Sequence, residues 1–565
     1  MLNYKKYKRF ETIELKDRKW PNNTINKAPI WCSVDLRDGN QALINPMTVD
    51  EKVEFFKLLV KLGFKEIEVG FPSASKIEYD FLRRLIEEDI IPDDVLVQVL
   101  TQARPHLIEK TFEALKGVNQ AIVHIYNSTS ILQRDVVFNM SKSEVKEIAI
   151  EGTKLVKEYV KSFPGKIYLE YSPESFTGTE MDYALEVCNA VVKTWGADKN
   201  NKVIINLPST VQMDTPNIFA DQIEYMCRGI KSRENVIISV HPHNDRGCGV
   251  AATELALLAG ADRVEGTHFG NGERTGNLDI ITVAMNMYSS GIDPKLDFSN
   301  ILKITDIYKK CTKLDVHVRH PYAGDLVFSA FSGSHQDAIR KGMKARKERN
   351  EYKWEVPYLP IDPHDLGREY KEIIRINSQS GKGGAIYIME NEFGFNIPKN
   401  MHKYFGKVVK EASDKMGKEL SPQEIYDLFK EWYIDIATPY RLKKYKINSV
   451  NSDVYDIKNC AENNILELEA IINFEGEDYI IKGQGNGPID AFNNALKQKE
   501  LKNYKFKNYY EHALSDGSHA KGVAYVEIED KGEPYFGVGI SENINTAAIN
   551  ALMNAINKSY MKMII

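Results

Sequence analysis

The chain has 565 residues, a length that predicts roughly two to four domains because single hydrophobic cores stop growing at about 250 to 300 residues. A net charge of -5 at pH 7, with 27% charged and 43% hydrophobic residues, excludes a bulk electrostatic attraction to nucleic acid or anionic membranes. No apolar run approaches the roughly 20 residues of a membrane helix, and the 6 cysteines form no C-x-x-C pair. We therefore expect a cytoplasmic protein. With its charge, we expect no nucleic-acid and no membrane partner.

Eight short runs rich in β-branched residues follow one another between residues 30 and 270. They are IWCSVDLRDG (30–39), FKEIEVGFP (64–72), VLVQVLTQA (95–103), QAIVHIYNS (120–128), KIYLEYSPE (166–174), KVIINLPST (202–210), NVIISVHPH (235–243) and DRVEGTHFG (262–270). Longer stretches between them, such as 49–63 and 142–160, repeat apolar residues at helical spacing. Eight such units predict an α/β fold, a closed (β/α)8 TIM barrel. An open dinucleotide-binding sheet would need G-x-G-x-x-G after its first strand, and that motif is missing there.

The pair His241 and His243 in VHPHND is the first candidate site, at the end of the seventh run. Residues two apart in a strand point to the same face, so both imidazoles would converge on one point. Asp38 ends the first run, and the carboxyl ends of barrel strands meet at one face. Two imidazoles and a carboxylate suit Zn²⁺, Mn²⁺, Co²⁺ or Fe²⁺, and Mg²⁺ with further oxygen ligands. The alternative is a pair of hydrogen-bonded core histidines.

The chemistry of two further polar residues at strand ends predicts a role for each. Arg37, beside Asp38, is expected to stabilise a developing oxyanion or to clamp a carboxylate, and its alternative is a salt bridge at the barrel rim. Glu174 in YSPESF is a candidate general base or orienting carboxylate, and its alternative is a solvated loop residue.

The sequence after the barrel changes character. Residues 344–370 are charged and then proline-rich, which is typical of an inter-domain segment. Two amphipathic helices are predicted around 403–417 and 421–434, the second with a capping box at Ser421 and Glu424. The end of the chain is doubled: YIIKGQGNGPIDAFNNAL (479–496) is echoed by PYFGVGISENINTAAINAL (534–552), which predicts a pseudo-twofold α+β domain. The G-x-G glycines in each copy permit tight turns or the close approach of a ligand.

Eight short motifs, taken together and in order, resemble the 2-isopropylmalate synthases of the longer type, which carry a C-terminal regulatory domain. They are SVDLRDGNQAL (33–43), EVGFPSAS (68–75), HIYNSTS (124–130), YSPESF (171–176), LPSTVQ (207–212), HPHND (241–245), GNGERTGN (270–277) and NSQSGKGG (377–384). The resemblance implies a Claisen condensation of acetyl-CoA with 3-methyl-2-oxobutanoate, then thioester hydrolysis to 2-isopropylmalate and CoA. This would be the committed step of leucine biosynthesis, with leucine as feedback inhibitor.

The resemblance also implies roles for residues of this sequence. The divalent ion, Mg²⁺ first or else Mn²⁺ or Zn²⁺, would be held by Asp38, His241, His243 and Asn277. Arg37 would stabilise the alkoxide, and the oxo-acid pocket would be lined by His124, Ser172, Glu174 and Thr210. His335 and Tyr370 would act in the site of a partner subunit, which predicts a homodimer. SQSGKGG (378–384) and RKGMKARKERN (340–350) are candidate phosphate contacts for coenzyme A.

Four domains follow from the same resemblance: a catalytic barrel with an N-terminal extension at 1–325, linker subdomains at 326–391 and 392–446, and a regulatory domain at 447–565. The alternatives are a homocitrate or citramalate synthase, a metal-dependent aldolase or lyase of the same barrel superfamily, and a leucine-responsive binding protein on an inactive barrel.

Overall fold

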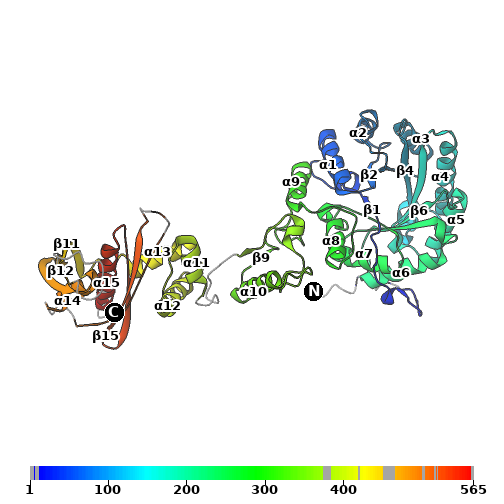
Figure 1. The fold of residues 1–565 in the computed structure, drawn as a ribbon. Coiled ribbons are helices and arrows are strands. Elements are labelled where there is room, and N and C mark those ends of the chain that lie inside the picture. Colours follow the sequence, from blue (N-terminus) through cyan, green and yellow to red (C-terminus); the bar gives the residue numbers. More distant parts are fainter. Residues whose placement is uncertain are drawn as a thin grey trace. The chain divides into compact units, whose positions relative to one another are not determined.

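A computed structural model describes residues 6, 10, 12–372, 383–417, 420–449, 465–498, 503–514, 517 and 520–561. The chain divides into two compact units (Figure 1). The first contains residues 1–328 with 359–370, and the second contains residues 329–358 with 371–565. The predicted inter-domain segment 344–370 therefore contributes to both units, and the four-domain division stays a prediction.

The first unit is built on a closed barrel of eight parallel strands in the order β1 to β8 (Figure 1). All eight runs predicted from the sequence are strands of this barrel, which confirms the predicted fold class. The strands are β1 Ile30–Ser33, β2 Glu66–Gly70, β3 Leu96–Gln102, β4 Gln120–Ser128, β5 Lys166–Glu174, β6 Val203–Ser209, β7 Val236–Pro242 and β8 Arg263–Gly266. Each is buried along most of its length, as expected for parallel strands covered by helices.

Helices lie between and after the strands: α1 Val49–Leu62, α2 Lys76–Glu87, α3 Pro105–Ala114, α4 Lys142–Ser162, α5 Met181–Trp195, α6 Pro216–Gly229, α7 Gly249–Leu258, α8 Ile280–Ser289 and α9 Ile301–Thr312. Capping boxes fix the starts of α1, at Thr48 and Glu51, and of α4, at Ser141 and Glu144. None of the helices in the described part of the chain combines the length and apolar character needed to cross a membrane.

The chain after β1, β7 and β8 positions the candidate site. A single turn of π-helix, η3 (Asp35–Gly39), follows β1 and carries Arg37 and Asp38. Beyond the end of β7, His243 forms an isolated antiparallel bridge with Asn277. This bridge brings the segment after β8 beside the end of β7, so residues far apart in the sequence meet at the C-terminal face of the barrel.

The second unit begins with β9 (Ser329–Ala330), which pairs in parallel with β10 (Lys371–Glu372), and with the helix α10 (Gly333–Arg349). Three helices follow: α11 (Gly383–Phe393), α12 (Lys399–Met416) and α13 (Pro422–Tyr433). The last two confirm the predicted helices, and Ser421 and Glu424 form the predicted capping box. All three helices share a hydrophobic core with the strands β15 and β16.

The doubled end of the chain forms two copies of one unit, each with three antiparallel strands and a helix. The first has β11 (Tyr440–Ser449), β12 (Leu466–Phe474), β13 (Glu477–Gly485) and α14 (Pro488–Gln498), and the second has β14 (Lys505–Ala513), β15 (Gly522–Asp530), β16 (Glu533–Ser541) and α15 (Ile544–Met561). One hydrophobic core contains residues of both copies, which agrees with the predicted pseudo-twofold α+β domain.

Of the two roles that the sequence suggested for the G-x-G glycines, tight turns or the close approach of a ligand, the structure excludes the turns. Gly483 and Gly485 lie in β13, and Gly537 and Gly539 lie in β16. A Cβ atom at Gly539 would stand 2.0 Å from the carbonyl oxygen of Ala547, and the other three positions meet the helix backbone at 2.2 to 2.4 Å. These glycines therefore let an alanine-rich helix pack directly on the strand before it.

Candidate active site

A cavity of about 370 Å³ opens at the C-terminal ends of the barrel strands. It is lined by Arg37, Asp38, Gln41, Phe71, Leu100, His124, Tyr126, Ser172, Glu174, Asn206, Pro208, Thr210, His241, His243, Glu273 and Arg274. Eight of these side chains belong to the eleven site residues expected from the sequence, so residues from η3, β4, β5 and β7 and from the segments directly after β6 and β7 are gathered at one place.

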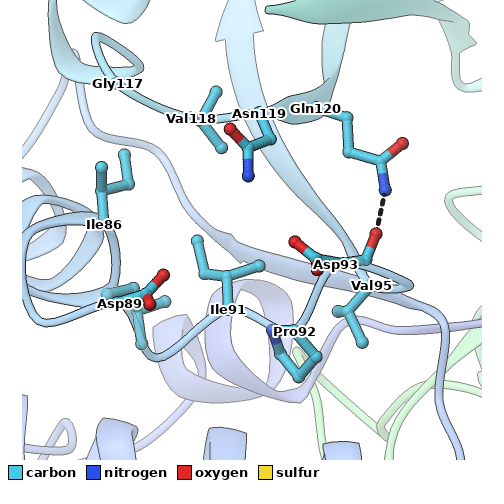
Figure 2. A pocket seen from close by; sticks show the side chains of 11 residues that line it. Ile86, Asp89, Ile91, Pro92, Asp93, Val95, Gly117, Val118, Asn119 and Gln120 are labelled. Carbon is cyan, nitrogen blue, oxygen red and sulfur yellow. Dashed lines mark hydrogen bonds between the residues drawn. The ribbon is translucent and has the colours of Figure 1, made fainter.

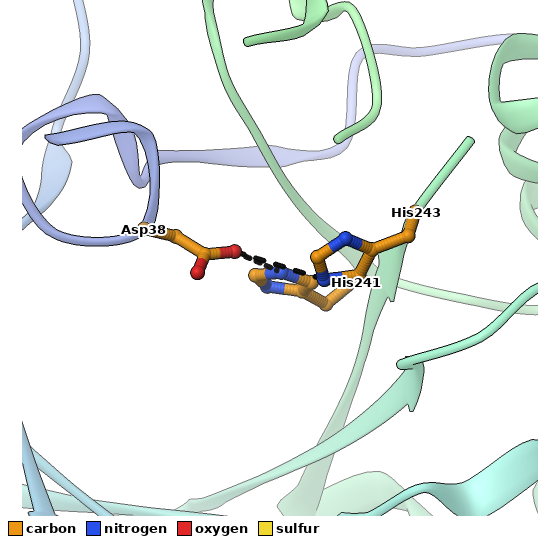
Figure 3. A group of neighbouring side chains, drawn as sticks. All are labelled: Asp38, His241 and His243. Atoms are coloured by element: carbon orange, nitrogen blue, oxygen red, sulfur yellow. Dashed lines mark hydrogen bonds and ion pairs between the residues drawn. The ribbon is translucent and has the colours of Figure 1, made fainter. Parts of the chain in front are cut away.

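Asp38, His241 and His243 meet at one point of this cavity (Figure 3). The Oδ2 atom of Asp38 lies 3.1 Å from Nε2 of His241 and 3.7 Å from Nε2 of His243. One potential ligand atom from each residue lies within 4.8 Å of the others, and all three side chains are buried. An ion at their common point would be held by two nitrogen atoms and one oxygen atom.

Asn277 completes this group. Its Nδ2 atom donates to Oδ2 of Asp38 at 2.7 Å, while its Oδ1 atom is buried and has no hydrogen-bond partner among the described residues. Rotating the amide by half a turn would direct Oδ1 toward the same point as the other three side chains, because the two amide atoms exchange places. A buried acceptor without a donor fits a cation, so the four residues fit a divalent metal ion.

The charges of the neighbouring groups prepare these ligands. Burial alone would raise the pKa of Asp38, but Arg37 and the two histidines outweigh it and hold the pKa well below its ordinary value. Burial and the nearby His241 lower the pKa of His243 to about 4, so its imidazole is neutral at pH 7. Burial would lower the pKa of His241, but the carboxylates of Asp38 and Glu265 outweigh it and raise the pKa to about 9. A metal ion that bound to this imidazole would displace the proton.

Glu265, on β8, orients His241: its Oε2 atom lies 2.7 Å from Nδ1 of the imidazole. This carboxylate fixes the proton on Nδ1 and turns the Nε2 lone pair toward Asp38. Glu265 also accepts hydrogen bonds from Arg263, Gln98 and Asn206, at 2.8, 2.9 and 3.1 Å. The orientation of the imidazole edge of His241 that faces Asp38 is thus set by a carboxylate that accepts from four donors.

Arg37 is held between two carboxylates. Its Nε atom lies 2.6 Å from Oε2 of Glu68, and its Nη1 atom lies 2.9 Å from Oδ1 of Asp38. Although burial would lower it, Asp38 and Glu68 raise the pKa of Arg37 above its ordinary value, so the guanidinium stays charged. Neither contact uses Nη2, which leaves one donor group of a cavity-lining residue available for an oxygen atom of a ligand.

His124 and Ser172 form a hydrogen-bonded chain on the next strands. Oε1 of Glu68 lies 3.0 Å from Nδ1 of His124, whose Nε2 atom lies 2.7 Å from the hydroxyl oxygen of Ser172. Asn206 donates to the same hydroxyl at 3.0 Å. With the proton on Nδ1 directed at Glu68, Nε2 accepts from Ser172. The two cavity-lining side chains therefore have fixed positions.

Glu174 and Thr210 face the cavity from β5 and from the end of β6. The carboxylate of Glu174 accepts a hydrogen bond from the hydroxyl of Ser128. Oγ1 of Thr210 accepts from the backbone N–H of Ser175 at 2.9 Å. Because that bond uses only a lone pair, the hydroxyl proton of Thr210 is available to donate to a ligand.

His335 and Tyr370 have no part in the cavity lining. His335 lies in the first turn of α10 in the second unit, is exposed, and stacks on Tyr358 with ring centroids 4.0 Å apart. Tyr370 is half-buried at the end of the segment 359–370 of the first unit. Their predicted action in a partner's site concerns an assembly of two chains and stays a prediction.

The two candidate phosphate-binding stretches differ in what the structure describes. Residues 378–382 of SQSGKGG lie outside the described residues. RKGMKARKERN belongs to α10 and its C-cap, where Asp337 pairs with Arg340 and Lys341 and where Arg346 stacks on Trp354. These contacts occupy part of the basic face of the helix.

Sequence reasoning missed the charged residues inside the barrel. Arg263 is fully buried, with Glu66 at 2.5 Å, Glu265 at 2.8 Å and Glu170 at 3.3 Å. His124, Glu170 and Glu265 also bring three ligand atoms within 4.8 Å, but the guanidinium of Arg263 already supplies the cation there, so we assign no metal ion to this group. The available signal was charged residues alternating within apolar strand runs, as in FKEIEVG and DRVEG.

A second hollow lies at the opposite ends of the strands, between the chain after α2 and the beginnings of β3 and β4 (Figure 2). Its volume is about 40 Å³, close to that of one water molecule, and the amide of Gln120 closes one side by donating to the carbonyl of Asp93 at 2.7 Å. It is too small for a substrate.

An α/β barrel that gathers two histidines, an aspartate and an asparagine above its strand ends has the architecture of a barrel enzyme with a divalent-metal centre. Three family models match the chain: HMGL-like at residues 28–307, the alpha-isopropylmalate synthase post-catalytic domain at 325–390, and the LeuA allosteric (dimerisation) domain at 419–560.

Similar proteins of known name identify the family within this class of barrel enzymes. A 2-isopropylmalate synthase from Clostridium acetobutylicum is 61% identical over 99% of this chain and 100% of its own length, and one from Acetoanaerobium sticklandii is 55% identical over 99% and 97%. Among solved structures, the HMG-CoA lyase from Brucella melitensis matches with a TM-score of 0.42 and 17% identity, over 51% of this chain and 100% of its own. The chain belongs to the 2-isopropylmalate synthase family.

Proposed function

We propose that the chain condenses acetyl-CoA with 3-methyl-2-oxobutanoate and hydrolyses the thioester, giving 2-isopropylmalate and CoA in leucine biosynthesis. The observation that carries this proposal is the buried group of Asp38, His241, His243 and Asn277 at the mouth of a cavity sized for a small acid. The close identity to synthases of that name supports the choice of reaction.

Those four residues would hold one divalent ion, most readily Mg²⁺, Mn²⁺ or Zn²⁺. The chemistry that a bound ion would supply there is Lewis-acid polarisation of the substrate ketone. Arg37, with its free Nη2 group, is placed to stabilise the negative charge that develops on the ketone oxygen. The hydroxyl group of Thr210 donates a hydrogen bond to the substrate carboxylate.

Apolar side chains of the cavity explain the choice of a branched oxo acid. Leu100, Tyr126, Pro208 and Phe71 line it together with the polar residues, and they offer an apolar surface to an isopropyl group. The carboxylate of a substrate such as 2-oxoglutarate would find less compensation against this surface. Discrimination between neighbouring aliphatic chains is worth only about 1 to 3 kcal/mol per methylene, so slower turnover of related oxo acids is expected.

Proton removal from the acetyl methyl group is assigned to His335, and both His335 and Tyr370 would be supplied by a second subunit. An imidazole suits a general base at neutral pH, and Glu174 can orient it or relay a proton through water. The match to a dimerisation domain at residues 419–560 supports a homodimer. His124 and Ser172 hold the oxo acid on the opposite wall of the cavity.

Leucine is the proposed allosteric inhibitor, bound by the doubled domain at the end of the chain. The match of this region to an allosteric domain supports the assignment. The pseudo-twofold domain offers a site separate from the barrel cavity, and leucine binding there must then lower activity through a coupling free energy between the two sites.

The test is thiol release from acetyl-CoA with a panel of 2-oxo acids, in metal-free buffer and with added Mg²⁺, Mn²⁺ or Zn²⁺, with and without leucine. We expect fastest release with 3-methyl-2-oxobutanoate, dependence on metal, inhibition by leucine, and loss of activity in Asp38→Asn. Asp262→Asn, at the other end of the barrel, is the matched control. A preference for 2-oxoglutarate or pyruvate would indicate a homocitrate or citramalate synthase, and no release would refute the proposal.

A further inference from the structure

The π-helical turn η3 (Asp35–Gly39) must hold Arg37 and Asp38 in fixed positions, although it is neither strand nor α-helix. One side chain reaches it from the helix that follows. The ammonium group of Lys52, on α1, lies 2.9 Å from the carbonyl oxygen of Leu36, the residue directly before Arg37. Leu36 and Lys52 are both completely buried.

Burying an ammonium group has a large desolvation cost unless a counter-charge is present. Among the described residues Lys52 is the only lysine whose side chain is completely buried. Glu78, on α2, supplies the counter-charge at 2.5 Å. An apolar side chain at this position of α1 would avoid the desolvation cost of the pair. We therefore expect the contact between Lys52 and the carbonyl of Leu36 to have a function.

The end of β2 is shaped around this pair. A Cβ atom at Gly70 would stand 1.8 Å from Oε2 of Glu78, so only glycine leaves room for the carboxylate. The amide of Asn40, directly after the turn, also approaches Oε1 of Glu78 at 3.5 Å. Three separate segments, α1, α2 and the end of β2, are thus arranged to place one ammonium group on the turn.

We propose that Lys52, neutralised by Glu78, is a positioning residue that holds the η3 turn through the carbonyl of Leu36 and thereby sets Asp38 for metal binding. This inference rests on the metal-ion role proposed for Asp38. Lys52 is not among the residues that line the cavity, so its effect must pass through the geometry of the turn. Outer groups that orient metal ligands typically change metal affinity by about 10- to 100-fold when they are removed.

Two variants separate this role from simple stability. Glu78→Gln removes the ion pair but keeps an acceptor for Lys52, whereas Lys52→Met/Glu78→Gln also removes the donor to Leu36. Mn²⁺ is titrated calorimetrically into the metal-free protein, at a temperature where circular dichroism shows each variant folded. We expect the double variant to bind Mn²⁺ at least ten-fold more weakly than Glu78→Gln, with kcat falling alongside.

Equal Mn²⁺ affinity in these two variants would overturn the inference. Should the first double variant fail to fold, Lys52→Met/Glu78→Leu replaces both partners by apolar groups of similar shape and is expected to show the same weakened binding. Lys65→Met, which breaks an exposed pair with Asp94, is the control and should bind Mn²⁺ as the unmodified chain does. Failure of the unmodified chain to bind Mn²⁺ would instead refute the proposed metal site.

Discussion

Glu265→Gln tests whether the buried carboxylate beneath His241 prepares the metal site. The carboxylate accepts from four donors: Arg263 and Gln98 on Oε1, and the N–H of His241 and Asn206 on Oε2. A glutamine offers one acceptor oxygen and one NH₂ group. Whichever way its amide turns, NH₂ must face two donors, and at least one of those donors loses its partner.

The cost can be worked from these contacts. Each unsatisfied buried donor costs about 1 to 3 kcal/mol, so the loss of one or two partners lowers the free energy of unfolding by about 1 to 6 kcal/mol. Loss of the carboxylate behind His241 lowers metal affinity by about 10- to 100-fold, which is about 1.4 to 2.7 kcal/mol. The second effect is specific to the site.

Calorimetric titration of Mn²⁺ and urea unfolding of the metal-free protein measure the two effects separately. Glu224→Gln is the matched control, because Glu224 is also buried and accepts from the backbone of Lys19 and Trp20, on the outside of the barrel. We expect this control to lower stability and to leave Mn²⁺ affinity unchanged. Unchanged Mn²⁺ affinity in Glu265→Gln would refute the reasoning.

Three further predictions concern the second unit and the assembly. Gly539→Ala should destabilise the C-terminal domain by about 1 to 3 kcal/mol in thermal unfolding, because its Cβ would press on α15, whereas Gly487→Ala, with nothing within 4 Å, should not. Burial lowers the pKa of Lys558 to about 7 in the folded chain, against about 10.5 in the unfolded chain. Between these two pH values the unfolded chain binds more protons, so the free energy of unfolding should rise with pH, and Lys558→Met should remove that slope. Asp38→Asn and His335→Asn chains, each inactive, should regain activity when mixed if His335 acts across a dimer, and continued inactivity of a verified mixed dimer would contradict this.

The barrel was predictable because its strands carry two independent signals. Each is a short β-branched run buried on both faces, and each ends in polar residues that only a functional face requires. His241 and His243 were identifiable because their spacing of two needs no knowledge of the fold beyond strand geometry. Asn277 followed only from the family resemblance, since an asparagine in a loop has no pattern of its own.

The supporting residues were not predictable for a physical reason. A charged residue inside an apolar run, such as Glu265 or Arg263, contradicts the pattern that identifies the strand, and most of its partners lie on other strands. Lys52 occupies a helix position where a lysine ordinarily meets water, and only the tertiary structure shows it buried against Leu36. The G-x-G glycines, for which the sequence suggested tight turns or the close approach of a ligand, lie in strands and make room for the helix that follows each strand.

The interior of the barrel explains why a cation belongs at its mouth. Two guanidinium groups, of Arg37 and Arg263, are shared among five carboxyl groups, those of residues 38, 66, 68, 170 and 265. Burial raises the pKa of Glu170 well above its ordinary value even beside Arg263, which disfavours a negative charge on this group. The remaining carboxylates still outnumber the guanidiniums, and without a metal ion the proton on His241 makes up part of the difference. A divalent ion takes over that role when it binds, which couples its affinity to the whole buried network and not only to its ligands.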